Sequence, residues 1–384
     1  MNIGIDVTSV VNQKAGIARY AKNLVLNLLK IDRENHYLLY SFFGNDQRKL
    51  APLLNIPVAV KDADCDFRLY DYQPQSLKTL LFLLRLIHKT ADSFIKEADI
   101  FHSPDFMWPA SAKKPSVITI QDLVFLKFPQ FFTWKNRTNM KSLARLSAKN
   151  AKAIICTSDS SKNDVIDLLR IKEEKIFVVH LGVDEIFKPA AAQKIEEAKE
   201  RFQLPENYVL ALGTIEPRKN LKRLLQAFLE LKKDKSFEHK LVIAGEKGWR
   251  YKDFFEELNN PDIAEEVMLT GHIDDNDLPA VYSGASVFVY PSLYEGFGLP
   301  PLEAMACGTP VVCSDTSSLP EVAGEAALLV NPLETRAIAE AIKKILDDDT
   351  LAKDLSQKGI QQAKKFTWKQ TAQKTLDVYN KLRS

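Results

Sequence analysis

Short runs of β-branched and aromatic residues alternate along the chain with glycine-bearing loops and amphipathic segments. Val287–Tyr290 is one such run, and the loop after it carries Gly296 and Gly298. A short helix is expected at Leu302–Cys307, because Pro300 and Pro301 are tolerated in a first helical turn, and Val311–Cys313 follows as a strand. Strand, loop, helix and strand in this order are typical of a parallel α/β sheet.

The same alternation recurs in both halves of the chain. Further strands are expected at Asn2–Val7, His36–Phe43, Val58–Val60, Asp99–His102, Ser116–Ile120, Ala153–Thr157, Ile176–His180, Tyr208–Leu212, Lys240–Ala244 and Val267–Thr270. Helices are expected at Ala18–Leu29, Leu77–Ile95, Phe131–Ala151, Ser158–Leu169, Leu221–Lys232, Leu278–Ser283, Glu334–Asp347 and Thr367–Leu382. The length of 384 residues suggests two domains, with the polar segment Ala190–Phe202 leading into the second.

Composition narrows the class of protein. Hydrophobic residues make up 46% and charged residues 27%, as in soluble globular proteins. The 52 basic and 50 acidic residues give a net charge of +2, which does not favour nucleic-acid binding. The four cysteines have no metal-ligand spacing, and the apolar segment Leu77–Ile87 is too short to span a bilayer. With no leader pattern before Asn2–Val7, a cytoplasmic location is expected.

The loop between Val287–Tyr290 and the next helix has the chemistry of an anion site. Glycines let backbone N–H groups approach a ligand, and the helix N-terminus adds partial positive charge. Glu295 and Glu303 flank this site, and carboxylates accept hydrogen bonds from hydroxyls rather than face a phosphate. A nucleotide-sugar, with phosphates between two hydroxyl-rich rings, fits both features. Spacing alone is equally compatible with a helix-capping Glu303 and a solvated Glu295.

The stretch YEGFGLPPLEAMACGTPVV resembles the retaining glycosyltransferases of family 4, whose signature is a Glu, seven residues and a second Glu. The resemblance extends over essentially the full chain. It implies the GT-B architecture, in which two Rossmann-like, doubly wound α/β domains face a deep cleft. The domains are expected at 1–187, completed by helix 367–384, and at 188–366. By resemblance, Glu295 holds sugar hydroxyls and Glu303 the ribose hydroxyls of the donor.

A pair of cations follows the strand Tyr208–Leu212. Arg218 and Lys219 stand in the loop GTIEPRKN, where two cations can neutralise a diphosphate. Lys219 matches the phosphate lysine of the family, whereas the usual arginine five residues earlier is Thr214, so Arg218 is expected to replace it. Solvation of two adjacent loop cations is the simpler alternative. In the family, the backbone near positions corresponding to Gly245 and His272 meets the nucleotide base.

Departures from the family pattern occur in the first half. Where family members read G-I-G-R-Y near the donor phosphates, this chain has Gly16, Ala18 and Arg19. Where they commonly have His-Asp at a strand tip, it has Gln121 and Asp122, and glutamine cannot titrate. His102 ends another strand, and a structural hydrogen-bonding role competes there with a role in the site.

These observations together predict a retaining hexosyltransferase. The candidate catalytic residues are Glu295, Arg218, Lys219 and Asp122; the donor-binding candidates are Gly16, Gln121, Thr214, Gly245, His272, Gly296, Phe297, Gly298, Leu299 and Glu303; the acceptor-side candidates are His102 and Arg19. The frames GTIEPRKN and FHSPDF resemble bacterial mannosyltransferases of polysaccharide assembly, so the first choice of donor is GDP-mannose, with a UDP-hexose or dTDP-rhamnose as alternatives. No metal or cofactor is expected. An epimerase and a catalytically silent nucleotide-sugar-binding protein remain as other classes.

The expected acceptor is a glycan or a lipid-linked oligosaccharide. A lipid-linked acceptor raises the question of contact with the cytoplasmic face of a membrane. Leu77–Ile87 is apolar enough for such contact, although core packing explains it equally simply. Phe131–Ala151 carries several cations, which fit either a solvated face or a contact with acidic lipid. Nucleic acid is not an expected partner.

Overall fold

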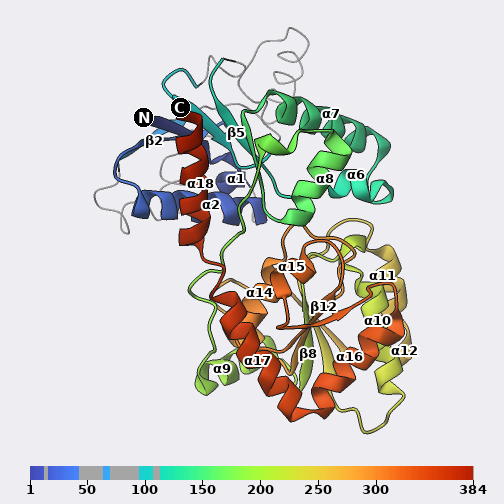
Figure 1. Cartoon of the computed structure of the whole chain (residues 1–384). Coiled ribbons are helices and arrows are strands. Elements are labelled where there is room, and N and C mark those ends of the chain that lie inside the picture. The colour runs from blue at the N-terminus through green and yellow to red at the C-terminus, as the bar shows by residue number, and fades with distance from the viewer. Residues whose placement is uncertain (13–15, 43–63, 70–94, 107–112, 384) are drawn as a thin grey trace. The chain divides into compact units, whose positions relative to one another are not determined.

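Two parallel β-sheets organise the chain, one in each of two units (Figure 1). The N-terminal unit comprises Met1–Gly182 and Trp368–Ser384, and the C-terminal unit comprises Val183–Thr367. The first unit thus ends at Gly182, where the sequence suggested residue 187. This computed structural model describes residues 1–12, 16–42, 64–69, 95–106 and 113–383.

The sheet of the N-terminal unit has, among the described residues, the strand order β3-β2-β1-β4-β5-β6-β7, and all neighbours are parallel. Its strands are β1 (Asn2–Asp6), β2 (His36–Ser41), β3 (Cys65–Leu69), β4 (Ile100–Ser103), β5 (Ser116–Ile120), β6 (Ala153–Cys156) and β7 (Ile176–Val178). Its helices are α1 (Thr8–Asn12), α2 (Gly16–Ile31), α6 (Val124–Lys127), α7 (Trp134–Asn150), α8 (Asp159–Leu169) and α18 (Trp368–Arg383), with 3-10 turns at Pro129–Phe131 and Glu173–Lys175.

The terminal helix α18 packs against α2 of the N-terminal unit (Figure 1). Its residues Trp368, Ala372, Leu376 and Tyr379 are all buried, as their helical spacing predicts. The Trp368 ring lies 6.4 Å from that of Tyr20, between centroids. The last helix of the chain therefore completes the first unit, in agreement with the architecture expected from the family.

Some elements expected for this unit differ from the structure or lie outside the described residues. Helix α1 lies between the expected strand Asn2–Val7 and the expected helix Ala18–Leu29, and α2 begins at Gly16, whose φ is not positive. Strand β3 at Cys65–Leu69 was not predicted, because its sequence CDFRL mixes charge into a short apolar run. The strand expected at Val58–Val60 and nearly all of the helix expected at Leu77–Ile95 fall outside the described part of the chain.

The sheet of the C-terminal unit has the strand order β10-β9-β8-β11-β12-β13, again with parallel neighbours. Its strands are β8 (Tyr208–Leu212), β9 (Lys240–Ala244), β10 (Val267–Gly271), β11 (Val287–Tyr290), β12 (Val311–Ser314) and β13 (Leu328–Val330). Its helices are α9 (Ala192–Phe202), α10 (Leu221–Lys232), α11 (Lys252–Leu258), α12 (Pro261–Ala264), α13 (Leu278–Ser283), α14 (Leu299–Ala306), α15 (Leu319–Ala323), α16 (Thr335–Asp347) and α17 (Asp349–Ala363), with a 3-10 turn at Pro217–Lys219. The order places β8 and β11 side by side, so the loops that follow them meet at one edge of the sheet.

Helices α10 and α16 pack against one face of this sheet and form a buried hydrophobic cluster with its strands. Phe228 of α10 and Ile342 of α16 are fully buried there with Val209 and Val289. Burying apolar side chains of this size contributes roughly 1.5–3 kcal/mol each. The strand tips that carry the site residues are therefore anchored by packed strands and helices.

Helix α14 begins earlier than expected, at Leu299 rather than Leu302. Gly298 is its N-cap with φ +114°, and Pro300 lies within the first turn, where its missing N–H costs nothing. Glu303 consequently lies beyond the first turn, which contains no acidic residue. The expected start at Leu302, which would place Glu303 in the first turn, was therefore wrong. Helix α17 was also missed, although Asp348 caps it by accepting hydrogen bonds from the N–H groups of Thr350 and Leu351.

Candidate functional site

The tip of β8 brings the backbone of two loops into close contact. Gly213 and Gly245 have φ of +140° and +151°, a region that glycine occupies without strain. A Cβ added at Gly245 would lie 2.1 Å from the carbonyl oxygen of Gly213. The Gly213 N–H donates to the carbonyl oxygen of Ala244, and that of Gly245 to the carbonyl oxygen of Gly271. Glycine is thus required at this edge of the sheet.

Asn220 fixes the far end of the phosphate-candidate loop, residues 213–220. It adopts a left-handed conformation with φ 57° and precedes helix α10. Its side-chain amide donates to the carbonyl oxygens of Pro291 and Pro332 at 3.0 and 2.7 Å. These bonds tie the loop after β8 to the loops that follow β11 and β13.

Three of the predicted catalytic residues form one buried ionic cluster, which we call the Glu295 cluster. Glu295 accepts from Arg218 Nη1 through Oε2 at 2.5 Å and from Lys219 Nζ through Oε1 at 2.7 Å. The Lys219 ammonium also donates to the Tyr290 hydroxyl. Glu216 binds the other edge of the Arg218 guanidinium, with its Oε1 2.9 Å from Nε and 2.6 Å from Nη2. The simpler alternative, a solvated Arg-Lys pair, is contradicted by this burial.

The charges in the Glu295 cluster shift each other's protonation. Burial alone would raise the pKa of Glu295, but Arg218 and Lys219 outweigh it and lower that pKa to about 2. Burial lowers the pKa of Lys219, against the opposing pull of Glu295. Burial also raises the pKa of Glu216, whose Oε2 is buried without a hydrogen-bond partner. Glu295 is therefore held as a carboxylate with both oxygens occupied by cations.

Serine side chains of the β12–α15 turn hold the loop that carries Glu295. The Glu295 N–H donates to Ser317 Oγ at 3.0 Å, and Ser318 Oγ donates to the carbonyl oxygens of Glu295 and Phe297 at 3.0 and 2.7 Å. Gly296, Phe297 and Gly298 are buried, whereas Leu299 is half-buried. The backbone around Glu295 is thus preorganised, and the side chain is the part that can change partners.

Glu303 lies apart from the Glu295 cluster in its contacts. Only 2% of the residue is exposed, and Oε2 accepts from the hydroxyl of fully buried Tyr282 at 3.1 Å. Tyr282 packs against Phe288 with ring centroids 5.3 Å apart. The proposed ribose contact of Glu303 therefore has a competing tyrosine partner in this structure. Thr214 and His272 are exposed and Gly245 is half-buried.

Gln121 and Asp122 of the N-terminal unit lie directly after strand β5, whereas Gly16 and Arg19 lie in helix α2. The Asp122 carboxylate accepts from the Val124 N–H at 3.0 Å, just before the short helix α6. The carbonyl oxygen of Gln121 accepts from Thr157 and Ser161, while its Nε2 is buried without a partner. Gly16 is exposed and Arg19 is half-buried in the first turns of α2.

His102 is a structural residue, and its acceptor-side assignment has to be withdrawn. It is fully buried, and its ring nitrogens lie 2.6 Å from the Tyr379 hydroxyl and 2.8 Å from Thr119 Oγ1. Tyr379 belongs to α18, so this bond fastens the last helix to β4. Burial lowers the pKa of His102 to about 3.

We expect His102 to make the stability of this unit depend on pH. Between pH 6.5 and about 3 the unfolded chain binds a proton that the folded chain does not, so stability falls as pH falls through this window. Within this window, we expect His102 to change the free energy of unfolding by about 1.4 kcal/mol per pH unit. Urea unfolding of the protein and of His102→Gln at several pH values measures the difference in slope. Equal slopes would contradict the assignment.

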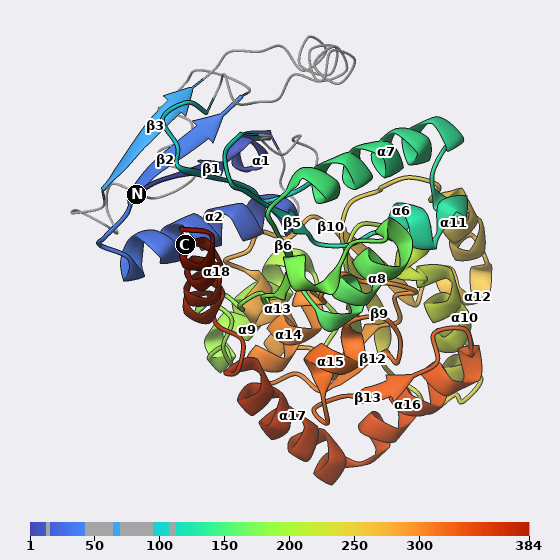
Figure 2. The ribbon, with the colours of Figure 1, turned by 45° about the horizontal axis from the view of Figure 1, so that its top comes forward.

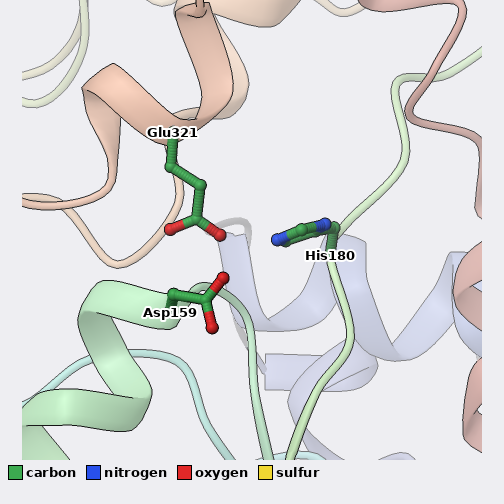
Figure 3. A group of neighbouring side chains, drawn as sticks. All are labelled: Asp159, His180 and Glu321. Carbon is green, nitrogen blue, oxygen red and sulfur yellow. The ribbon is translucent and has the colours of Figure 1, made fainter.

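Three further titratable side chains are drawn in Figure 3. Asp159 lies in the first turn of α8 and His180 in the segment after β7, both in the N-terminal unit. Glu321 lies in α15 of the C-terminal unit. Two potential ligands within one unit are too few for a metal centre, so these residues carry no metal proposal.

Among the described residues, no helix has the length and apolar character needed to cross a bilayer.

Comparison with known proteins identifies the family. A family model described as Glycosyltransferase Family 4 matches residues 15–186, and one described as Glycosyl transferases group 1 matches residues 192–362. The O-antigen chain mannosyltransferase B of Escherichia coli is 34% identical over 284 residues, which cover 74% of each chain. The chain belongs to glycosyltransferase family 4.

Solved structures show the same fold as this glycosyltransferase. Sucrose-phosphate synthase from Thermosynechococcus elongatus superposes with a TM-score of 0.75 at 21% identity, over 99% of this chain and 98% of that one. Anabaena HepE, solved in complex with UDP and glucose, gives a TM-score of 0.77 at 17% identity, over 99% and 100% of the two chains. The glycosyltransferase therefore has the predicted GT-B type of fold, with two Rossmann-like domains.

Sequence reasoning missed several members of the site of this glycosyltransferase. Glu216 stands inside the quoted GTIEPRKN loop but received no role, and Tyr290 was assigned only to a strand. Tyr282 and Ser318 carry no sequence signal, because their contacts join residues more than 20 positions apart. An acidic residue two positions before an arginine was the one available hint, for Glu216.

Proposed function

We propose that this glycosyltransferase transfers mannose from GDP-mannose to a hydroxyl of a glycan or lipid-linked oligosaccharide, with retention at the anomeric carbon. Support for mannose comes from the E. coli relative, which is named as a mannosyltransferase and matches over most of its length. A UDP-hexose or dTDP-rhamnose is the alternative donor.

The observation that carries the proposal is the Glu295 cluster. Two cations and two carboxylates balance in charge, and Arg218 and Lys219 both point at Glu295. A diphosphate carries negative charge of the kind that both cations bind, so it competes with Glu295 for them. The donor therefore exchanges with Glu295: the diphosphate takes the cations, and the released carboxylate accepts hydrogen bonds from the hydroxyls of the sugar.

This exchange assigns a task to each group when the glycosidic bond breaks. Lys219 and Arg218 stabilise charge that develops on the departing diphosphate, in a site shielded from water. Glu295 enters the exchange as a carboxylate, because Arg218 and Lys219 lower its pKa before the donor binds, and it then orients the sugar. We propose that the two cations perform the charge neutralisation without a metal, and that the departing diphosphate guides the acceptor to the same face, which gives retention.

Glu216 is expected to position Arg218 throughout the exchange, because it binds Nε and Nη2 and leaves Nη1 to change partners. Glu216→Gln should lower turnover about 10-fold, since hydrogen bonds to charged groups contribute about 1.5–3 kcal/mol. Initial rates at saturating acceptor measure the effect. Glu206→Gln, at an exposed acid of the same unit, is the control. Equal rates for both variants would contradict the role of Glu216.

A lipid-linked acceptor implies that the enzyme works at a membrane surface. We propose peripheral contact with the cytoplasmic face of a membrane as part of the function.

The test of the function is release of GDP from GDP-mannose with and without acceptor. A transferase releases GDP in proportion to acceptor consumed and gives an α-linked product by NMR. Release without acceptor indicates hydrolysis or another reaction of the sugar nucleotide, and binding without release indicates a silent binding protein. Turnover unchanged by a chelator supports catalysis without a metal, and loss of turnover restored by a divalent cation overturns that part.

A further inference from the structure

Helix α7 carries positive charge that the rest of the described chain leaves uncompensated. Over 17 residues it contains five Lys or Arg and no Asp or Glu. Arg137, Lys141, Arg145 and Lys149 recur every fourth residue, so they form one stripe along the helix, about 18 Å long. Arg137 and Lys141 are half-buried, whereas Arg145, Lys149 and the nearby Lys135 are exposed. Like charges at this spacing repel each other and destabilise a helix.

Two acids on elements that follow α7 in the chain are engaged by other lysines. Asp164 of α8 pairs with Lys127 at 2.6 Å, and Glu173 pairs with Lys162 at 2.6 Å. Within the described ranges, no ion pair joins a cation of α7 to a carboxylate. The stripe therefore keeps its positive charge in the folded unit, and this charge favours a negatively charged partner.

An exposed aromatic side chain stands at the start of the same helix. Trp134 is 76% exposed, more than any other large hydrophobic residue of the described chain. The opposite side of α7 is buried through Ala144, Ser147 and Ala148, and the helix lies beside α6 and α8 (Figure 2). Its free side thus combines tryptophan with lysine and arginine, the residues that proteins place at the boundary between water and a bilayer.

We propose that the free side of α7, which we call the α7 face, binds the surface of a membrane rich in anionic lipid. The inference rests on the proposed lipid-linked acceptor and identifies the surface that brings the enzyme to it. The cations contact lipid phosphates and Trp134 enters the headgroup region. A soluble acidic partner would use the charges but gives no reason for an exposed tryptophan, so the membrane is the occupant that both features favour.

The experiment is cosedimentation of the full chain with vesicles of phosphatidylcholine alone or mixed with phosphatidylglycerol. We expect binding only to the mixed vesicles, weakened by salt. The triple variant Lys135→Gln, Arg145→Gln and Lys149→Gln should lower the partition coefficient on the order of 100-fold, since each cation near an anionic surface contributes about fivefold. The control removes the same charge from exposed lysines of the C-terminal unit: Lys235→Gln, Lys353→Gln and Lys364→Gln.

Tryptophan fluorescence provides the second readout. Mixed vesicles should shift the emission of the protein to shorter wavelength, and Trp134→Phe should remove most of that shift. Equal vesicle binding by the triple and control variants, or no binding by the unmodified protein, would overturn the α7 face. Binding to soluble polyglutamate but not to vesicles would assign the charge to an acidic polymer instead and would also overturn it.

Turnover with a short, water-soluble acceptor separates this inference from the proposed function. The triple variant should retain that turnover, because no residue of α7 belongs to the candidate site. Absence of turnover in the unmodified protein would reject the proposed function. The vesicle experiment would still test membrane binding by the α7 face independently.

Discussion

Lys219→Ala is expected to lower turnover by about 100-fold or more, because a preorganised charge contact with a developing anion contributes several kcal/mol. Lys219 is buried between Tyr290 and Glu295, so its loss removes one of the two cations of the Glu295 cluster and nothing charged takes its place. Arg218→Ala should have a comparable effect. Initial rates with varied GDP-mannose at saturating acceptor measure both.

Lys222→Ala is the matched control, since Lys222 lies three residues on, in the first turn of α10, with half of its side chain exposed. Its surface pair with Glu257 contributes little, about 0–1 kcal/mol. Near-normal turnover in the Lys219 and Arg218 variants would remove this loop from the mechanism.

Glu295→Gln is expected to lower turnover with little change in the Michaelis constant for the donor, whereas Glu303→Gln should act mainly on that constant. Glu295 is proposed to leave Arg218 and Lys219 and hold the transferred sugar, whose position and charge change as the bond breaks, so its loss is felt in turnover. Glu303 is buried beside Tyr282, and its proposed ribose partner changes little during the reaction. Loss of such uniform binding raises the Michaelis constant alone.

The effect of Glu295→Gln should also differ between sugar epimers of the donor, because its carboxylate is proposed to hold sugar hydroxyls. Glu303→Gln should weaken all donors with the same nucleotide alike. The reverse pattern, or identical effects from the two variants, would contradict this division of roles.

Much of the C-terminal unit follows from its sequence. The runs Val287–Tyr290 and Tyr208–Leu212 are strands as predicted. Both are short, continuous apolar runs, which are typical of strands in a parallel sheet that is covered on both faces. The order of these strands puts Arg218, Lys219 and Glu295 at one edge, which the family pattern anticipated. Their direct pairing could not be predicted, since it joins residues 77 and 76 positions apart.

The errors have identifiable physical causes. Helix α14 starts at Leu299 because Gly298 adopts a positive φ and caps it, and no rule of sequence selects between two possible starts around Pro300 and Pro301. His102 could not be separated from a site residue, because its burial depends on Tyr379, which is 277 positions away.

Competition between a diphosphate and Glu295 for Arg218 and Lys219 is the central claim of the proposed mechanism. Calorimetric titration of GDP, which has the diphosphate but lacks the transferred sugar, tests this competition in the unmodified protein, Lys219→Ala and Glu295→Gln. We expect Lys219→Ala to lose most of its affinity for GDP, and Glu295→Gln to bind GDP at least as tightly as the unmodified protein, because the competing carboxylate is gone. Weakened GDP binding in Glu295→Gln, to the same degree as in Lys219→Ala, would contradict the competition.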